Sequence, residues 1–354
     1  MRRGIVLLVV AGTSLAVLAG ALVFYLTFGW RSEKFSPPLV VEVRRGEPFS
    51  ALARRLEDAG AIPDARTFAL LARWRGDDRR IRSGEYELTG GTTAAEVLAA
   101  LVSGRQRLRM VTVPEGLTVE ETALVFERAG IGDMQRFREL AKDEAFLKTL
   151  DLPVPRLEGY LFPDTYAFER DVPAEEIIRR MTARFRKMMT PDLVEAAKER
   201  GLTVDQAVTL ASIIEKEAAI AEERPMISAV FHNRLKRGMP LQSDPTVLYG
   251  VTDRPAGRIR TADLTRATPY NTYVIPGLPP GPICNPGRAS IEAAVRPAPN
   301  VTALYFVARN DRTHEFNDTL AGHQRAVNRW QRGNRTSPTP RDTPPAAAAA
   351  NGKR

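Results

Sequence analysis

The stretch "TVDQAVTLASIIEKEAAIAEE" (residues 203–223) decides how the C-terminal half of the chain folds. Thr203 and Gln206 form a capping-box pattern ahead of an apolar run, which predicts a helix that begins at about Val204. At about 100° per residue, one face of this helix is apolar. That face contains Ala207, Leu210, Ala211, Ile214 and Ala218. The pattern predicts a core helix.

Two glutamates follow one residue apart in this helix, and they point in different directions. Glu215 falls on the apolar side, whereas Lys216 and Glu217 fall on the polar side, where we expect a solvent-exposed surface. A carboxyl group on the core side must be paired or have a raised pKa, and a raised pKa suits a general acid. Glu215 is therefore the candidate catalytic residue. The alternative is that Glu215 is hydrogen-bonded or paired with an arginine.

Three later segments are rich in turn-forming residues: "GMPLQSDPTVLYG" (238–250), "TPYNTYVIPGLPPGPICNPG" (268–287) and "LYFVARNDRTHEF" (304–316). The prolines and glycines of the second segment predict a rigid loop that suits a binding groove. Amide, hydroxyl and aromatic groups are those that a sugar ring requires. The candidate substrate-binding residues are Gln242, Ser243, Asp244, Tyr270, Asn271, Thr272 and Tyr273. For each one, ordinary turn chemistry is the alternative.

A pattern near the N-terminus recurs after 70 residues. Val41, Val43, Gly46, Ala59 and Gly60 recur as Val111, Val113, Gly116, Ala129 and Gly130. Each copy predicts a strand, a turn, a helix that stops at Ala-Gly, and a second helix around Phe68 or Phe137. "GEYEL" (84–88) predicts the strand that closes the first unit. Coincidence between two ordinary βα units is the alternative. Two further helices are expected at about 174–189 and 191–200.

Residues 4–30 contain no charged side chain, and this run exceeds the roughly 20 residues that cross a bilayer as a helix. An aromatic flank near Trp30 favours an uncleaved membrane anchor over a secretory signal. Arg2 and Arg3 favour a cytoplasmic N-terminus, so the soluble part of the chain should lie on the extracytoplasmic side of the membrane. The Pro- and Ala-rich residues 331–354 predict a disordered tail.

Composition excludes several classes of function. The formal charge of +9 comes largely from the two ends of the chain, which argues against nucleic-acid binding. Cys284 is the only cysteine, so no internal disulfide or thiolate zinc cluster can form. The three histidines lack the H-E-x-x-H spacing of metal hydrolases. We therefore expect neither a metal nor a cofactor.

Long ordered strings closely resemble the MltG/YceG-like family, the membrane-anchored endolytic murein transglycosylases of bacteria. The strings are "EGYLFPDTY" (158–166), "ASIIEKE" (211–217), "LQSDPTVLYG" (241–250), "YNTYVIPGLPPGPICNPG" (270–287) and "LYFVARND" (304–311). The N-terminal βα units resemble the LysM-like region of such proteins. Ser243 and Cys284 stand where we expect threonine and a small residue in relatives, which are mild departures.

The resemblance implies cleavage of peptidoglycan between N-acetylmuramic acid and N-acetylglucosamine without water, leaving 1,6-anhydro-muramic ends. It implies that the first glutamate of E-K-E, Glu215, acts as acid and then as base. It also implies a single-pass protein of the inner membrane with a periplasmic catalytic domain. The implied partners are glycan strands and peptidoglycan synthases (penicillin-binding proteins) of the division or elongation machinery, with the termination of nascent strands as the biological role.

The expected fold class is α+β, with an N-terminal transmembrane helix, LysM-like βα modules and a mixed catalytic domain. The expected domains are a cytoplasmic stub (1–3), the membrane helix (4–30), a LysM-like module (38–108), a second βα unit (109–155), a YceG-like catalytic domain (156–330) and the tail (331–354). Two alternatives stay open. One is a lysozyme-like hydrolase in which Asp244, Asp164 or Glu217 is a second carboxylate, and the other is a non-catalytic wall-binding scaffold.

Overall fold

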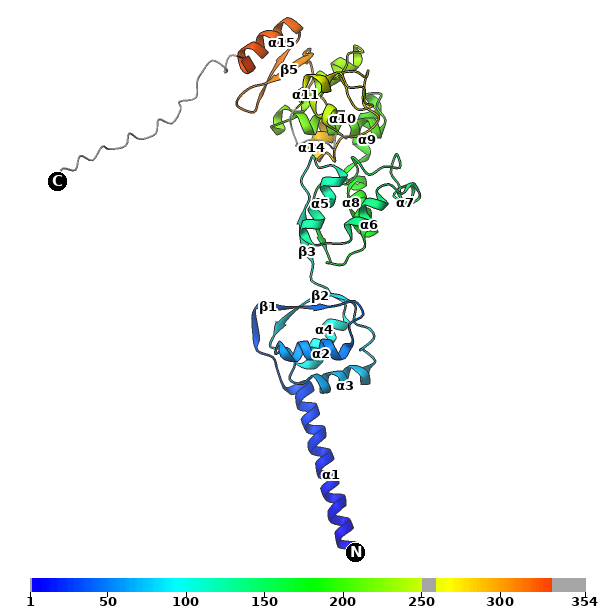
Figure 1. Cartoon of the computed structure of the whole chain (residues 1–354), viewed down its shortest axis with the longest axis vertical. Helices are drawn as coiled ribbons and strands as arrows, with labels where there is room; N and C mark the ends of the chain where they lie inside the picture. Colours follow the sequence, from blue (N-terminus) through cyan, green and yellow to red (C-terminus); the bar gives the residue numbers. More distant parts are fainter. Residues whose placement is uncertain (1, 250–258, 333–354) are drawn as a thin grey trace, which may run out of the picture. The chain divides into compact units, whose positions relative to one another are not determined.

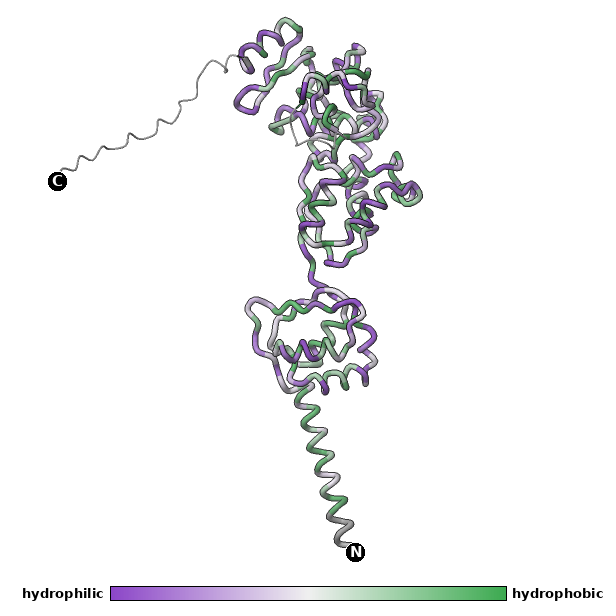
Figure 2. Tube along the Cα trace, viewed as in Figure 1, coloured by the Kyte–Doolittle hydropathy of each residue, from purple (hydrophilic) through white to green (hydrophobic). Residues whose placement is uncertain are grey.

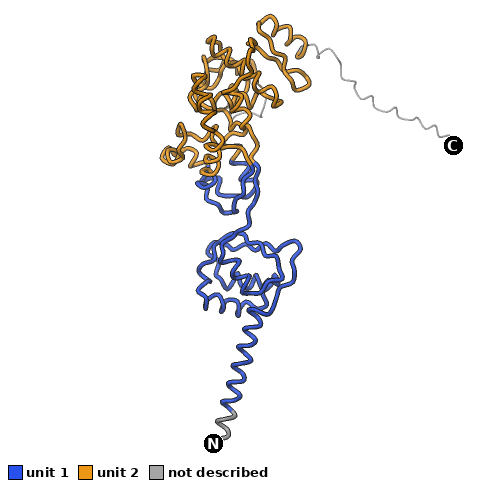
Figure 3. Tube along the Cα trace, turned by 180° about the vertical axis from the view of Figure 1, so that it is seen from behind, with its two compact units in different colours: residues 1–112, 123–137, 165–177 blue, residues 113–122, 138–164, 178–354 orange. Residues whose placement is uncertain are grey.

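The computed structural model describes residues 2–249 and 259–332. The chain divides into two compact units (Figure 3). Unit 1 contains residues 1–112, 123–137 and 165–177, and unit 2 contains residues 113–122, 138–164 and 178–354. Helices predominate, and the strands of the described residues form three separate two-stranded antiparallel sheets. The expected mixed α+β fold is therefore confirmed.

Unit 1 begins with the apolar helix α1 (Arg2–Phe24), which continues into the short π-helical segment η1 (Tyr25–Gly29). Figure 2 shows the hydrophobic character of this helix along most of its length. Residues Leu8–Gly29 form one helical stretch that is long and apolar enough to cross a membrane. This stretch agrees with the anchor that the charge-free run predicts.

The next part of unit 1 has the order strand, helix, helix, strand, helix. Its elements are β1 (Lys34–Val43), α2 (Phe49–Asp58), α3 (Ala65–Arg75), β2 (Gly84–Gly90) and α4 (Ala94–Val102). β1 and β2 pair antiparallel, with Val41 opposite Tyr86. The helix α2 stops before Ala59, because Gly60 adopts φ 68°, a left-handed conformation that favours glycine. The strand predicted at "GEYEL" is confirmed.

The first three elements of this order, a strand and two helices, recur further along the chain, and a third helix then precedes the closing strand. Its elements are β3 (Arg109–Thr112), α5 (Val119–Ala129), α6 (Met134–Leu140), α7 (Glu144–Lys148) and β4 (Thr165–Phe168). β3 pairs antiparallel with β4, and Arg109 lies opposite Phe168. Each copy of the repeated sequence pattern thus supplies one strand and two helices, and a later strand closes its sheet, after the additional helix α7 in the second copy. This agreement favours a genuine repeat over coincidence.

Helices make up most of unit 2. Besides α7, they include the C-terminal part of α8 (Ala174–Met188), then α9 (Pro191–Glu199), α10 (Val204–Glu217), η2 (Ala221–Glu223), α11 (Arg224–Lys236), α12 (Asp244–Leu248), α13 (Thr261–Leu264), α14 (Arg288–Val295), α15 (Leu320–Val327) and η3 (Asn328–Arg332). The strands β5 (Tyr305–Ala308) and β6 (His314–Asn317) form a hairpin. The helices α9, α11 and α14 surround α10 (Figure 1).

The central helix α10 forms as its sequence predicts. The Thr203 hydroxyl accepts a hydrogen bond from the backbone N–H of Gln206, and the Gln206 side chain accepts one from the N–H of Thr203. Every residue from 207 to 214 is buried. The helix ends at Glu217, because Ala218 has an extended backbone with ψ 111°. The helices expected at about 174–189 and 191–200 are confirmed as α8 and α9. Most of the predicted tail, from residue 333, lies outside the described residues.

Candidate active site

The carboxyl group of Glu217 lies at the C-terminal end of α10 and is half-buried. Its Oε1 accepts a hydrogen bond of 2.6 Å from the hydroxyl of Ser243. Burial raises the pKa of Glu217 to about 7 and the negative charge of Asp244 adds to this effect, while the Ser243 hydroxyl and the Arg234 guanidinium oppose it. The expectation that Glu217 faces solvent is therefore wrong. The segment that carries Ser243 folds over the last turn of α10, so the polar side of the helix is covered there.

Glu215, by contrast, is held by two partners. Its Oε1 accepts a hydrogen bond from Arg224 Nη2 at 3.1 Å, and its Oε2 accepts one from the backbone N–H of Gly287 at 3.0 Å. Its side chain is only 7% exposed. Arg224 also donates to the Ser290 hydroxyl, so the pair joins α10 to the starts of α11 and α14. This arrangement corresponds to the alternative in which Glu215 is paired with an arginine.

A third carboxyl group lies beside this ion pair. Arg224 Nη2 is 3.8 Å from an oxygen of Glu115, which precedes α5. Burial raises the pKa of Glu115 and the negative charge of Glu215 adds to this effect, while the Arg224 guanidinium opposes it. Gly287 allows the Glu115 carboxyl group to lie close to the backbone at residue 287, because a Cβ atom there would lie 1.9 Å from Glu115 Oε1. The positive charge of Arg224 therefore lies close to two carboxyl groups, those of Glu115 and Glu215.

The structure brings two of the predicted substrate-binding segments together next to Glu217. The N–H of Ser243 donates to Thr272 Oγ1 at 2.9 Å, and the N–H of Gln242 donates to the Thr272 carbonyl at 3.0 Å. The Tyr273 hydroxyl donates to Asp244 Oδ1 at 2.6 Å. Gln242 and Asp244 are exposed and Tyr273 is half-buried. These three side chains can therefore meet a ligand beside the Glu217 carboxyl group.

Two other predicted binding residues are buried and hold the loop. Asn271 is 1% exposed, and its side-chain amide donates to three backbone carbonyls, those of Asp263, Leu264 and Arg266. Thr272 is fully buried, and its hydroxyl lies 2.8 Å from that of Thr246. This burial favours a role in positioning the loop over direct contact with a ligand.

Tyr270 belongs to a second cluster. Its ring centroid lies 4.6 Å from that of Tyr249, whose hydroxyl donates to Glu158 Oε2 at 3.1 Å. Glu158 also accepts the N–H of Val119 at 3.1 Å. Burial raises the pKa of Glu158 to about 7, while the hydrogen bonds from Val119 and Tyr249 lower it. Sequence reasoning missed Glu158, although the apolar and aromatic residues that directly follow it in "EGYLFPDTY" are a signal of burial.

Arg234 is a further residue that sequence reasoning missed. It is 7% exposed and donates to the Leu304 carbonyl at 2.7 Å and to the Leu241 carbonyl at 2.8 Å. Two further bonds, both at 3.2 Å, reach the Pro240 carbonyl and the side chain of Gln242. Arg234 therefore fixes the segment that leads to Ser243. Arg234 lies one helical turn after the apolar Val230, and this spacing was the available signal that its side chain is on the buried face of the helix.

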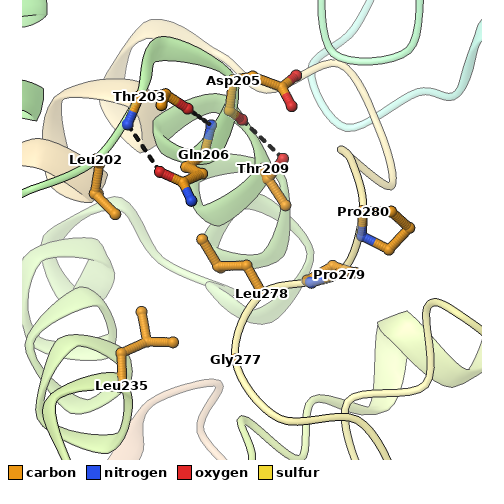
Figure 4. A pocket seen from close by; sticks show the side chains of 10 residues that line it. All are labelled: Leu202, Thr203, Asp205, Gln206, Thr209, Leu235, Gly277, Leu278, Pro279 and Pro280. Atoms are coloured by element: carbon orange, nitrogen blue, oxygen red, sulfur yellow. Dashed lines mark hydrogen bonds between the residues drawn. The ribbon is translucent and has the colours of Figure 1, made fainter.

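A pocket of about 560 Å³ lies at the other end of α10 (Figure 4). Its lining residues are Leu202, Thr203, Asp205, Gln206, Thr209, Leu235 and residues 277–280. Asp205 accepts a hydrogen bond of 2.7 Å from the Tyr160 hydroxyl, and Thr209 donates to the Asp205 carbonyl. These residues belong to the first two turns of the helix, whereas Glu217 is its last residue. The pocket is therefore separate from the Glu217 site.

The described residues were also compared with the requirements of a metal site and of a reactive thiol. No group of three or more His, Cys, Asp or Glu side chains there is arranged to hold a metal ion. Cys284 is buried, donates to the Ser212 carbonyl, and has a pKa raised well above the ordinary value, because burial disfavours the thiolate.

Comparisons with known proteins agree on one family. The model of the YceG-like family matches residues 41–329. The endolytic murein transglycosylase of Bacillus subtilis (strain 168) is 32% identical, with 89% of this chain and 91% of the relative covered. That of Streptococcus pneumoniae serotype 2 (strain D39) is 31% identical over 76% of this chain, which spans 54% of the relative's length.

A solved structure supports the same grouping. The crystal structure of a yceG-like protein, lmo1499, from Listeria monocytogenes is 31% identical and has a TM-score of 0.57. The match covers 82% of this chain and 99% of that chain. The family model covers far more than half of the sequence, so the resemblance found in the sequence strings is confirmed. The chain belongs to the YceG-like family.

Proposed function

We propose that this protein is a lytic transglycosylase that cuts peptidoglycan strands internally, between N-acetylmuramic acid and N-acetylglucosamine, and leaves 1,6-anhydro-muramic ends. Relatives that bear the name endolytic murein transglycosylase match most of this chain, which supports the proposal. One observation in the structure carries the chemistry. The half-buried carboxyl group of Glu217 has a pKa raised to about 7 by burial and lies beside polar groups that are open to a ligand.

In this proposal Glu217 is both acid and base. The protonated carboxyl group gives its proton to the glycosidic oxygen as the bond to C1 of the muramic residue breaks through an oxocarbenium-like state. The resulting carboxylate then accepts the proton of the muramic 6-hydroxyl as that oxygen bonds to C1. The proton count balances, so no water is consumed, and Glu217 ends the cycle protonated.

The geometry favours Glu217 over Glu215 for this role. An acid catalyst must present a carboxyl oxygen to the substrate, but Arg224 and Gly287 occupy both oxygens of Glu215. The Glu215 side chain is only 7% exposed, so little of it is open to a ligand. The assignment to Glu215, which the sequence resemblance implies, therefore serves as the competing prediction in the experiments below.

The residues around Glu217 divide into two groups in this proposal. Gln242, Asp244 and Tyr273 contact the glycan, because they are open to a ligand. Ser243 adjusts the pKa of Glu217 through their hydrogen bond. Asn271 and Thr272 are buried and hold the loop in position. Tyr270 lies in the neighbouring cluster and offers an aromatic ring to a sugar further along the strand.

We further propose that the apolar helix is a single-pass anchor. Its N-terminus lies in the cytoplasm, and the soluble part of the chain lies on the extracytoplasmic side. The helical stretch Leu8–Gly29 supports this arrangement by its length and composition. The domain boundaries proposed from the sequence go with it, with residues 38–108 as a LysM-like module, 109–155 as a linking unit and 156–330 as the catalytic domain. Nascent strands supplied by peptidoglycan synthases are the proposed substrate, and their cleavage terminates elongation.

A hydrolase is the second candidate, and the exposed carboxylate of Asp244 beside Glu217 is the observation that favours it. Asp244 could hold a water molecule or act as the nucleophile, as the second carboxylate of glycosidases does. Asp164 is less suited to this role, because its carboxylate pairs with Arg184 at 2.6 Å.

Product mass tests the proposed reaction. The full chain in detergent would digest purified peptidoglycan, and the soluble fragments would be weighed beside those from a lysozyme digest. Anhydro-muramic ends, lighter by one water than the lysozyme products, would support the transglycosylase. Reducing ends would favour the hydrolase with Asp244. Absence of cleavage by folded protein would refute both and favour the wall-binding scaffold.

A further inference from the structure

The helix α3 presents an unusual exposed face. Arg66, Leu70, Arg73 and Trp74 recur at the spacing of one side of a helix, and all four are exposed. Leu70 is 60% exposed and Trp74 is 81% exposed. The other side of α3 supplies buried residues, including Phe68, to the core. We call the four exposed residues the basic-aromatic face.

The end of α3 lies beside the end of the candidate membrane span. The guanidinium carbon of Arg75 is 6.0 Å from the centre of the Phe28 ring. Phe28 belongs to η1, which packs on both α3 and α4 and buries Thr27. The span that includes η1 ends at Gly29. Trp74, the residue before Arg75, is therefore close to the level at which the chain leaves the apolar layer.

Hydrogen bonds also fix the residues that directly follow the span. The N–H of Ser32 donates to the Thr92 carbonyl at 3.0 Å, and the Arg31 guanidinium donates to the Gly91 carbonyl at 2.9 Å. Only two residues separate Gly29 from Ser32. The chain therefore has no long linker with which to move α3 away from the membrane surface.

We propose that the basic-aromatic face lies on the membrane that α1 crosses, with Trp74 and Leu70 at the lipid–water interface and Arg66 and Arg73 on the phosphates of anionic lipids. This inference rests on the proposed membrane anchor. Tryptophan is enriched at this interface, and arginine binds phosphate with paired hydrogen bonds. Juxtamembrane basic residues are attracted to anionic lipid surfaces.

A glycan strand is the competing occupant, because a sugar ring could stack on Trp74. Two features favour lipid. The neighbouring arginines suit an anionic partner, and the face adjoins the end of the span. The contact would hold the first module of unit 1 against the bilayer, so that α1 and α3 together fix its orientation.

The test places one cysteine at a time in the full chain and labels it with a nitroxide. Cys284 is buried and stays unlabelled in the folded protein. The three sites are Leu70→Cys on the face, Leu108→Cys as a matched control and Val17→Cys within the proposed span. Leu108 is 54% exposed, close to the value for Leu70. The protein is reconstituted in vesicles of phosphatidylglycerol and phosphatidylethanolamine, and collisions with oxygen and with a water-soluble nickel chelate are compared.

The label at position 70 should collide with the nickel chelate several-fold less often than the label at position 108. The added substitutions Arg66→Glu and Arg73→Glu should remove most of this difference. If the label at position 17 is in the lipid while that at position 70 is as accessible as the control, the docking inference is wrong and the anchor stands. If the label at position 17 is itself in water, the anchor fails and the inference fails with it. Protection of position 70 only after glycan strands are added would assign the face to sugar and overturn the lipid reading.

Discussion

The hydroxyl of Ser243 donates a hydrogen bond of 2.6 Å to the carboxyl group of Glu217, and this contact links the last residue of α10 to the first residue before α12. It places the carboxyl group where two segments, 242–244 and 271–273, meet. The hydroxyl favours the ionised form of Glu217, while burial and Asp244 favour the protonated form. The balance leaves the pKa near neutrality, which is the range in which one carboxyl group can both give and take a proton.

Cleavage should depend on pH through Glu217. Because its pKa is raised to about 7, the group is protonated and able to act as an acid below that pH. We expect kcat/KM to fall about tenfold per pH unit above pH 7. The measurement is the rate of glycan cleavage from pH 5 to 9. Glu158 also has a pKa near 7, so Glu158→Gln is the control. The fall of kcat/KM above pH 7 is the alkaline limb of the profile. If this limb is lost in Glu158→Gln, it belongs to Glu158 instead.

Removing the Ser243 hydroxyl should move this limb. The hydroxyl lowers the pKa of Glu217 by stabilising the carboxylate. Ser243→Ala should therefore raise the pKa and shift the alkaline limb of the rate to higher pH, by about one to two units, since a hydrogen bond to a charged group contributes about 1.5–3 kcal/mol. Ser243→Thr keeps a hydroxyl and should keep the wild-type profile. A limb that stays in place in Ser243→Ala would show that the bond does not control the acid.

The pair of Glu215 and Arg224 should matter for stability. Glu215→Gln leaves the largely buried guanidinium of Arg224 with less negative charge, so we expect a loss of about 2 kcal/mol in the free energy of unfolding. The double variant with Arg224→Gln should lose less than the sum of the single losses. Asp192→Asn, which breaks the exposed pair with Arg296, is the control and should leave the free energy of unfolding nearly unchanged. Urea unfolding measures the free energy of unfolding of each variant. A loss in Glu215→Gln no larger than that in Asp192→Asn would contradict a structural role for the pair.

Asn285 should be a second structural requirement. Its Oδ1 accepts the N–H groups of Gly159 and Leu161 at 2.9 and 3.0 Å, and its Nδ2 donates to the Leu117 carbonyl. Asn285→Ala leaves these buried groups without partners, so we expect about 3 kcal/mol of destabilisation in urea unfolding. Asn310→Ala, at an exposed site, should have little effect. A loss under about 1 kcal/mol would mean that water replaces the amide.

Local signals predicted most of the elements. The capping box of Thr203 and Gln206 placed the start of α10, and the Ala-Gly pair at residues 59 and 60 placed the end of α2. The repeated pattern predicted the strand, helix, helix order of both copies. Such features succeed because caps, turns and apolar periods act over a few residues.

The directions of the two glutamates were harder to predict. The angle around the helix correctly separated Glu215 from Glu217, but it does not determine which side later segments will cover. Glu217 is the last residue of α10, and a segment that begins more than twenty residues later folds over it. Arg234 was missed for a similar reason, because its carbonyl partners are the remote Leu304 and the nearby turn at Leu241. Long-range contacts of this kind leave little trace in local sequence.

The most direct measurement compares glycan cleavage by wild type, Glu217→Gln and Glu215→Gln on the same peptidoglycan, with products weighed and folding checked by urea unfolding. Glutamine keeps the shape and the hydrogen bond from Ser243 but cannot give a proton. We expect Glu217→Gln to lower the rate by roughly 100- to 10,000-fold, while folded Glu215→Gln still releases anhydro-muramic ends. A folded Glu215→Gln variant without activity, beside a Glu217→Gln variant that cleaves at the wild-type rate, would contradict the assignment and return the acid to Glu215.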